Sequence, residues 1–253
     1  MLSVGPEDAE RSVLLLPGGA NAARSFDLVM ADPALSGVRL VATTMPGMAG
    51  APLTDDVTIP GLARAAGELA TAHRSDLVVG FSHGATVALE MVLSGTFPGP
   101  VVLLGISLTT EDEADFYRLA VRLSQKVGRW PLGILLRLVP LTARSSTIPA
   151  PHKRDLVEDL KQNRAADAVR VSSVYLDCIA ADRDYASELA TCSQRAWVVH
   201  AEKGDGGLTD SERATLEAAD NVTLVIPGSV FLLPDEAPDR IAAVIAEALS
   251  ALP

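Results

Sequence analysis

The chain has 253 residues, 48% of them hydrophobic and 21% charged, which is typical of a globular protein large enough for one α/β domain with an insertion. Its formal net charge of −11 argues against a nucleic acid partner, because binding to phosphates requires clustered Lys and Arg. The two cysteines, Cys178 and Cys192, are too few for a disulfide framework, so we expect a reducing, cytoplasmic environment.

The sequence contains no segment that predicts export or membrane insertion. Residues 1–12 are polar and lack the basic and apolar regions of a signal peptide. The apolar stretch 131–141 is too short to cross a bilayer and contains Arg137. We therefore expect a small-molecule substrate, and neither nucleic acid nor membrane, as the partner of this protein.

Short apolar runs bounded by turn residues recur along the chain and predict strands at 13–16, 38–42, 77–79, 101–104, 196–200 and 222–226. Uninterrupted, β-branched runs of this kind are typical of parallel strands that are buried on both faces. Helical patterns lie between them, at about 22–30, 60–73, 85–94, 211–219 and 237–252. Thr209 and Glu212 predict a capping box before the fourth of these helices. The alternation predicts an α/β fold with a doubly wound, mainly parallel sheet.

The first two predicted strands are each followed by a glycine-containing loop. Pro17-Gly18-Gly19 follows the first strand, and Met45-Pro46-Gly47-Met48-Ala49-Gly50 follows the second. Neither these loops nor the later glycines have the spacing of a P-loop or of a dinucleotide-binding fingerprint, so we expect no cofactor.

The third predicted strand leads into Gly80-Phe81-Ser82-His83-Gly84, and a helical pattern begins at Ala85. A serine on such a strand-turn-helix junction projects its hydroxyl above the sheet, where the amides of the helix N-terminus favour negative charge. Glycine is required on both sides because a side chain there would collide with the neighbouring strand and helix. Ser82 is therefore the candidate nucleophile.

Helical periodicity without strands extends over residues 107–195. Two apolar stripes with helical spacing predict helices there, namely Phe116, Leu119, Ala120 and Leu123, and Val171, Val174, Tyr175 and Cys178. Pro131, Pro140, Pro149 and Pro151 are expected to divide the segment into several helices. We interpret residues 107–195 as a helical lid inserted into a core of residues 1–106 and 196–253. Trp130 and the leucines after it either line an apolar pocket or pack between helices.

Two further stretches, Ile226-Pro227-Gly228 and Leu233-Pro234-Asp235, follow downstream. Together with the motifs above, and in the same order, they resemble the motifs of the α/β-hydrolase superfamily. The resemblance implies that Ser82 is the nucleophile and that residues 45–50 are the Pro-Gly-x-Gly loop of the family. It further implies that the loop of Gly18 and Gly19 supplies an oxyanion hole, with the amides of Gly19 and His83 as donors. We expect about six main strands, with the N-terminal hairpin of the family missing or reduced.

The same alignment places Phe231 where the family has its catalytic histidine. A phenyl ring cannot accept a proton, and a serine is a poor nucleophile without an adjacent base, so the triad is incomplete or atypical. Asp205 lies near the usual acid position, although a solvated loop carboxylate is an equal interpretation. Glu111 and Asp112 are alternative acids.

Any of the four histidines could in principle replace the missing base. His83 adjoins the nucleophile, but consecutive side chains diverge on this turn, so packing is the simpler interpretation. His200 ends a strand and resembles a structural histidine of the family, and His73 lies in a predicted surface turn. His152, in the lid, is the one that we consider mobile enough to reach Ser82. No His, Cys or carboxylate pair has metal-ligand spacing, so no metal is expected.

The leading hypothesis is an enzyme that acts on a small apolar ester, thioester or lactone through Ser82, with Asp205 as the supporting acid and Phe231 at the substrate site. Two alternatives remain open. The first is a lyase, cyclase or isomerase in which Ser82 and the oxyanion amides polarise a carbonyl group. The second is a small-molecule-binding protein without catalytic activity.

Overall fold

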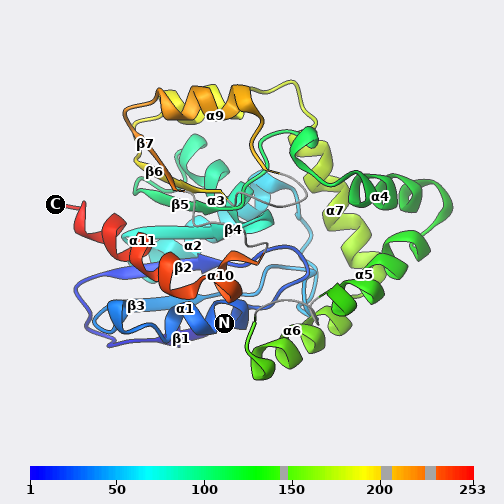
Figure 1. Cartoon of the computed structure of the whole chain (residues 1–253), viewed down its shortest axis with the longest axis horizontal. Coiled ribbons are helices and arrows are strands. Elements are labelled where there is room, and N and C mark those ends of the chain that lie inside the picture. Colours follow the sequence, from blue (N-terminus) through cyan, green and yellow to red (C-terminus); the bar gives the residue numbers. More distant parts are fainter. Residues whose placement is uncertain (143–147, 201–206, 226–231) are drawn as a thin grey trace.

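A seven-stranded sheet forms the centre of the protein in the computed structural model, which describes residues 1–142, 148–200, 207–225 and 232–253 (Figure 1). In spatial order the strands are β1 (Leu2–Val4), β3 (Arg39–Ala42), β2 (Ser12–Leu16), β4 (Leu77–Phe81), β5 (Val101–Leu104), β6 (Ala196–Val199) and β7 (Val222–Val225). Strands β2 to β7 are parallel to their neighbours, whereas β1 pairs antiparallel with β3.

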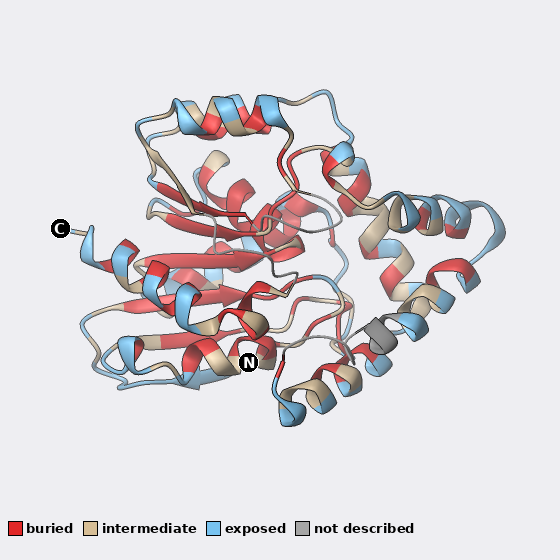
Figure 2. Ribbon diagram, in the orientation of Figure 1, coloured by how far each residue is buried: buried red, intermediate tan, exposed pale blue. Residues whose placement is uncertain are grey.

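Successive side chains of the central strands point into two separate cores, because side chains alternate along a strand. On one face, Leu14 and Leu16 pack in the core that includes α2 (Ile59–Ala72), α3 (His83–Leu93) and α9 (Asp210–Glu217). On the other face, Val13 and Leu15 pack with α1 (Asp27–Met30) and α11 (Pro238–Ser250). Short elements complete the core, namely the 3-10 turns Ala23–Phe26 and Pro33–Leu35 and the helix α10 (Leu233–Glu236). The strands β2, β4, β5 and β6 are buried on both sides (Figure 2).

In the described part of the connection from β5 to β6 there are five α-helices. They are α4 (Asp115–Val127), α5 (Trp130–Thr142), α6 (Ala150–Gln162), α7 (Ala165–Ile179) and α8 (Tyr185–Thr191), and a 3-10 turn at Thr110–Asp112 precedes them. Helices α4 to α7 lie beyond the carboxyl ends of the parallel strands (Figure 1), whereas α8 packs against α3 and α9 beside the sheet. Loops at the carboxyl ends of parallel strands are where α/β proteins build their sites.

The predicted fold class, the six parallel strands and the Thr209–Glu212 capping box are confirmed. The strand count needs one correction, since β1 adds a seventh strand at the sheet edge. Its residues are exposed, so β1 lacks the buried apolar run by which the other strands were recognised. Pro140 lies inside α5 and does not divide two helices. No helix in the described part of the chain is long and apolar enough to cross a membrane.

Candidate active site

Ser82 occupies the junction between β4 and α3 with an unusual backbone conformation. Its φ and ψ angles are 48° and −115°, a region that residues with a side chain rarely adopt. The amide of Ser82 donates to the carbonyl of Leu104 in β5, and its own carbonyl accepts from Ala85, each at 2.8 Å. Such conformations cost about 1–3 kcal/mol and persist where the surrounding structure enforces them, often at functional sites.

The glycines on both sides of Ser82 allow the tight approach of helix and sheet. A Cβ atom on Gly84 would lie 2.2 Å from the carbonyl oxygen of Leu16 in β2. A Cβ atom on Gly80 would lie 2.2 Å from the carbonyl oxygen of Gly84. Because both neighbours are backbone atoms, they cannot move aside as a flexible side chain could.

Ser82 lines a cavity of about 240 Å³ that is enclosed mainly by apolar side chains. The sheet side contributes Gly19, Ala20, Met48, Ser82 and His83. The inserted helices contribute Phe116 and Tyr117 from α4, Leu132, Leu135 and Leu136 from α5, Leu160 from α6, and Ala168, Ser172 and Tyr175 from α7. An apolar cavity with a few converging polar groups is the usual form of a small-molecule site.

The structure brings Gly19 and His83 together beside Ser82. A Cβ atom on Gly19 would lie 3.9 Å from Cβ of His83, and both residues line the cavity. His83 is the first residue of α3, so its amide has no acceptor within the helix. Gly18 lies one residue further back, where a Cβ atom would meet the ring of Phe81 at 2.8 Å. Gly18 thus shapes the loop, whereas Gly19 and His83 border the cavity itself.

Asn163, between α6 and α7, holds two loops of the site in place, a role that was not expected from the sequence. Its Nδ2 atom donates to the carbonyl of Ala20 at 2.8 Å, and its Oδ1 atom accepts from the amide of Ala49 at 2.9 Å. Both alanines have positive φ angles, of 63° and 42° respectively. A lone asparagine in a helix connection carries no sequence signal for such a long-range role.

Among the described residues that line the cavity, Glu113 is the one with a carboxylate side chain. Its Oε1 atom accepts hydrogen bonds from the hydroxyl groups of Tyr175 at 2.5 Å and Ser107 at 2.8 Å. Burial, and then the neighbouring Glu113 carboxylate, raise the pKa of Tyr175 well above its ordinary value, so this phenol stays protonated and donates. Glu113 was not among the acids expected from the sequence, which were Asp205, Glu111 and Asp112.

His83 is buried at the side of the cavity, with its ring centroid 5.5 Å from that of Tyr175. Burial lowers the pKa of His83 to about 4, so the imidazole is neutral at pH 7. Its two ring nitrogens have no hydrogen-bond partner within the described part of the chain. A neutral, weakly basic imidazole agrees with the packing interpretation of this side chain.

The other candidates from the sequence lie apart from Ser82 or outside the described residues. Asp205 and Phe231 fall in segments that the structure does not describe. Glu111 is exposed, and Asp112 is buried where its carboxylate accepts from the amides of Leu108 and Thr109 at 2.7 and 2.8 Å. Burial raises the pKa of Asp112 above its ordinary value. The side chain of Asp112 thus stabilises the turn at residues 108–112 and does not line the cavity of Ser82.

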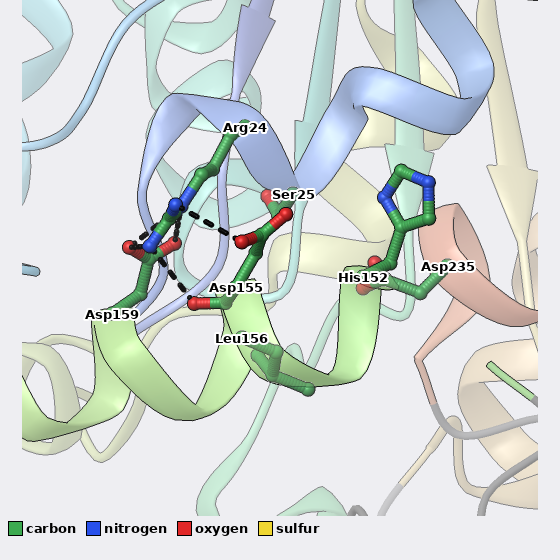
Figure 3. Close-up of a pocket in the computed structure, with 7 residues that line it drawn as sticks. All are labelled: Arg24, Ser25, His152, Asp155, Leu156, Asp159 and Asp235. Atoms are coloured by element: carbon green, nitrogen blue, oxygen red, sulfur yellow. Dashed lines mark hydrogen bonds and ion pairs between the residues drawn. The ribbon is translucent and has the colours of Figure 1, made fainter. Parts of the chain in front are cut away.

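His73, His152 and His200 do not line the Ser82 cavity either. His73 follows α2, and His200 is a buried residue at the end of β6, where burial lowers its pKa. His152 lies on α6 in a separate small pocket with Arg24, Asp155, Asp159 and Asp235 (Figure 3). Among the described residues, no group of three His, Cys, Asp or Glu side chains is placed to hold a metal ion.

Comparisons with known proteins identify the family and the fold. The sequence model of the alpha/beta hydrolase family matches residues 13–244. A hydrolase from Oleispira antarctica superimposes with a TM-score of 0.74 at 14% identity, over 99% of this chain and 94% of that one. Esterases from Exiguobacterium antarcticum and a Rhodococcus species give TM-scores of 0.72 and 0.73 at 11% and 15% identity, with the same coverage of 99% and 94%. No curated protein matches the sequence.

Proposed function

Because the chain belongs to the alpha/beta hydrolase family, we propose that it is an esterase-like enzyme that attacks a small apolar ester, thioester or lactone with the hydroxyl of Ser82. The observation that carries the proposal is the position of Ser82, on a strained turn that opens into an apolar cavity of about 240 Å³. The apolar lining favours acyl and alkyl groups over charged ones. In this proposal α4 to α7 form the lid of the site, within the insertion 107–195.

The reaction follows from the arrangement of these groups. The Ser82 oxygen adds to the carbonyl carbon, and the electrons of the C=O bond move to the oxygen, which the amides of Gly19 and His83 stabilise. Collapse of this intermediate expels the alcohol or thiol, which takes up a proton. Water then adds to the acyl-enzyme by the same route and releases the acid. The inserted helices exclude bulk water, which strengthens the amide interactions.

The proton of Ser82 requires an acceptor, and the position that resembles the family histidine is Phe231. We assign this role to Glu113, which lines the same cavity. Tyr175 and Ser107 donate to its Oε1 atom, and within the described residues its Oε2 atom accepts no hydrogen bond. Asp205 keeps the role of a supporting acid that the resemblance implies.

The test of hydrolysis compares the wild type with Ser82→Ala in two assays, labelling by a fluorophosphonate probe and turnover of a chromogenic short-chain ester. We expect labelling and turnover in the wild type and neither in the variant. Ser94→Ala, at the far end of α3, is the matched control and should behave like the wild type. A folded wild-type protein that is silent in both assays would contradict hydrolysis.

The presence of Glu113 in the cavity also favours a second function, a lyase or isomerase reaction. Glu113 would remove a proton from the carbon next to a carbonyl group, while Ser82 and the two amides stabilise the enolate oxygen. A carbonyl compound incubated with the protein in D₂O would then gain deuterium at that carbon, as measured by NMR. Glu113→Gln should abolish the exchange. Absence of labelling, turnover and exchange, with ligand binding retained, would instead indicate a binding protein.

A further inference from the structure

Helices α4 and α5 expose an unusual amount of apolar surface. Seven large side chains on them are 40–59% exposed, and we call this set the α4–α5 face: Phe116, Leu119, Leu123, Val127, Trp130, Ile134 and Leu138. The other large apolar side chains that are exposed in the described part of the chain are all in Met1–Val4. Spacings of three and four residues align each set along its helix. Contiguous exposed apolar surface of this kind usually marks an interaction site.

The apolar surface of α5 continues around the helix. Leu132, Leu135 and Leu136 line the Ser82 cavity, whereas Trp130, Ile134 and Leu138 are exposed on the other side. A helix that is apolar all round is normally covered on all sides. The hydroxyl of Ser124 accepts from the amide of Leu132 at 2.9 Å and fixes α5 against the end of α4. No described part of the chain therefore covers the apolar side chains of the α4–α5 face.

The charge of the α4–α5 hairpin is opposite to that of the whole protein. Residues 115–138 contain five basic residues and one acidic residue, whereas the chain has a net charge of −11. The acidic residue, Asp115, pairs with Arg118. The remaining basic residues, Arg122, Lys126, Arg129 and Arg137, are exposed and form no ion pair with another described residue.

This combination identifies the kind of partner. Aromatic and aliphatic side chains next to exposed Lys and Arg are the signature of helices that lie in the interface of an anionic lipid bilayer. Both helices protrude from the body of the molecule, and their outer surfaces are exposed (Figures 1 and 2). A second copy of the chain fits less well, because a twofold contact would place these basic side chains against their own copies.

The α4–α5 face is also continuous with the cavity. Phe116 is 55% exposed and at the same time lines the cavity that contains Ser82. We propose that the α4–α5 face binds peripherally to the surface of anionic lipid membranes, with its apolar side chains in the interface and its basic side chains at the lipid headgroups. If the function proposed above holds, an apolar substrate can pass from the bilayer into the cavity at Phe116.

Peripheral binding differs from the sequence-based expectation that the protein has no membrane partner. That expectation rested on the lack of a spanning segment, which a peripheral contact does not require. The net charge of −11 also masks the local excess of positive charge on the α4–α5 hairpin.

The test is co-sedimentation of the purified protein with vesicles of phosphatidylcholine, with and without phosphatidylglycerol. We expect binding to the vesicles that contain phosphatidylglycerol, and weaker binding as salt is added. Trp130→Ala should lower the partition coefficient about tenfold, because it removes a large side chain from the interface. The double variant Arg122→Glu/Lys126→Glu should lower it on the order of a hundredfold.

The double variant Arg74→Glu/Arg195→Glu is the matched control. It changes the net charge by the same amount, and both residues are exposed. Arg74 lies three residues before β4 and Arg195 directly before β6, so both are near the amino ends of the strands, at the opposite edge of the sheet. This control variant should bind like the wild type. Equal loss in both double variants, or no binding to either kind of vesicle, would overturn the proposal. Light scattering could also show that the protein is a dimer and that only the α4–α5 variants are monomeric. That result would overturn the proposal in favour of a second copy of the chain.

Vesicle binding is measured without substrate, so it is independent of catalysis. Ser82→Ala should bind vesicles like the wild type. A protein that reacts with the fluorophosphonate probe but does not bind vesicles would contradict the membrane proposal alone. A protein that binds vesicles but shows no turnover would contradict the proposed hydrolysis alone.

Discussion

At the scale of single residues, the site depends on glycines that bring three backbone segments into contact. Gly84 lets the first turn of α3 approach the end of β2, and Gly80 lets β4 pass under the same turn. Only with this close approach can Ser82 hold its φ angle of 48° and present its hydroxyl to the cavity. The strain at Ser82 is thus balanced by contacts that the neighbouring glycines make possible.

Gly84→Ala is expected to destabilise the protein strongly. The added Cβ atom would lie 2.2 and 2.6 Å from the carbonyl oxygens of Leu16 and Pro17, and neither can move without distorting the sheet. We expect the free energy of unfolding in urea to fall by about 3 kcal/mol. Gly37→Ala is the control, because no atom lies within 4 Å of its Cβ position. Equal stability of the two variants would contradict this account of the turn.

Phe231→His tests whether a histidine at this position accepts the Ser82 proton more effectively than Glu113, the base that we propose. If the resemblance of residues 226–238 to the histidine-bearing segment of the family holds, the new imidazole can accept the Ser82 proton. General-base catalysis typically contributes about 10²–10⁴-fold, so kcat/KM for a short-chain ester should rise within that range. Phe231→Leu, which keeps the position apolar, should not raise it. A correctly folded Phe231→His protein with an unchanged rate would count against this alignment.

At the scale of elements, Arg24 links α6 to the core through ion pairs with Asp155, Glu158 and Asp159, of which the pair with Asp159 is the shortest. Arg24, in the 3-10 turn before α1, donates from Nη2 to Oδ1 of Asp159 on α6 at 2.5 Å and from Nε to Oδ2 of the same carboxylate at 2.9 Å (Figure 3). The side chain of Asp159 is 6% exposed, so the pair is partly shielded from solvent. Bidentate pairs of this type are among the stronger polar contacts in proteins.

Asp159→Asn is expected to lower the free energy of unfolding by about 1–3 kcal/mol, because the amide cannot accept both hydrogen bonds from the guanidinium. Asp155→Asn is the matched control on the same helix. Asp155 lies 3.4 Å from the same arginine but is 44% exposed, so its loss should cost less than about 1 kcal/mol. Urea unfolding measures both variants. A larger loss of unfolding free energy for Asp155→Asn than for Asp159→Asn would contradict the assignment of Asp159 as the main partner of Arg24.

At the scale of the whole molecule, stability depends on pH through carboxyl groups that folding buries. Burial, and then the charges of Glu236 and Asp27, raise the pKa of Asp235 from 3.8 to about 7. Burial also raises the pKa values of Asp27 and Asp112. The folded state therefore holds these protons at pH values where the unfolded chain has released them. Each such group stabilises the protein below its unfolded pKa and loses that contribution as the pH rises through its folded pKa.

Asp235→Asn should flatten the decline of stability between about pH 4 and 7, because the amide does not titrate. Burial lowers the pKa of His83, which acts in the opposite direction over part of this range, so the difference between variants is the relevant measure. Asp239→Asn, an exposed residue of α11, removes the same charge and should keep the slope of the wild type. The measurement is the melting temperature of the three proteins across this range. Identical slopes would contradict the raised pKa of Asp235.

Local patterns in the sequence were enough to predict the fold class. The six parallel strands follow from uninterrupted apolar runs, and the Ser82 turn follows from the glycines and the serine between a strand and a helix. The Thr209–Glu212 capping box is equally local, since its two hydrogen bonds join residues three positions apart. The exposed strand β1 was missed because pairing with β3 defines it and burial does not.

The sequence by itself determined where strands, helices and the serine turn lie, because hydrophobic period, glycine and caps act over a few residues. Only the tertiary structure decided which side chains meet. The stripe of Phe116, Leu119 and Leu123 predicts α4, yet it faces solvent, while Val121 and Ser124 are buried. Likewise Glu113 meets Tyr175, 62 residues away, and Asn163 meets Ala20 across 143 residues. Such contacts depend on how whole helices pack against the sheet, which no local pattern encodes.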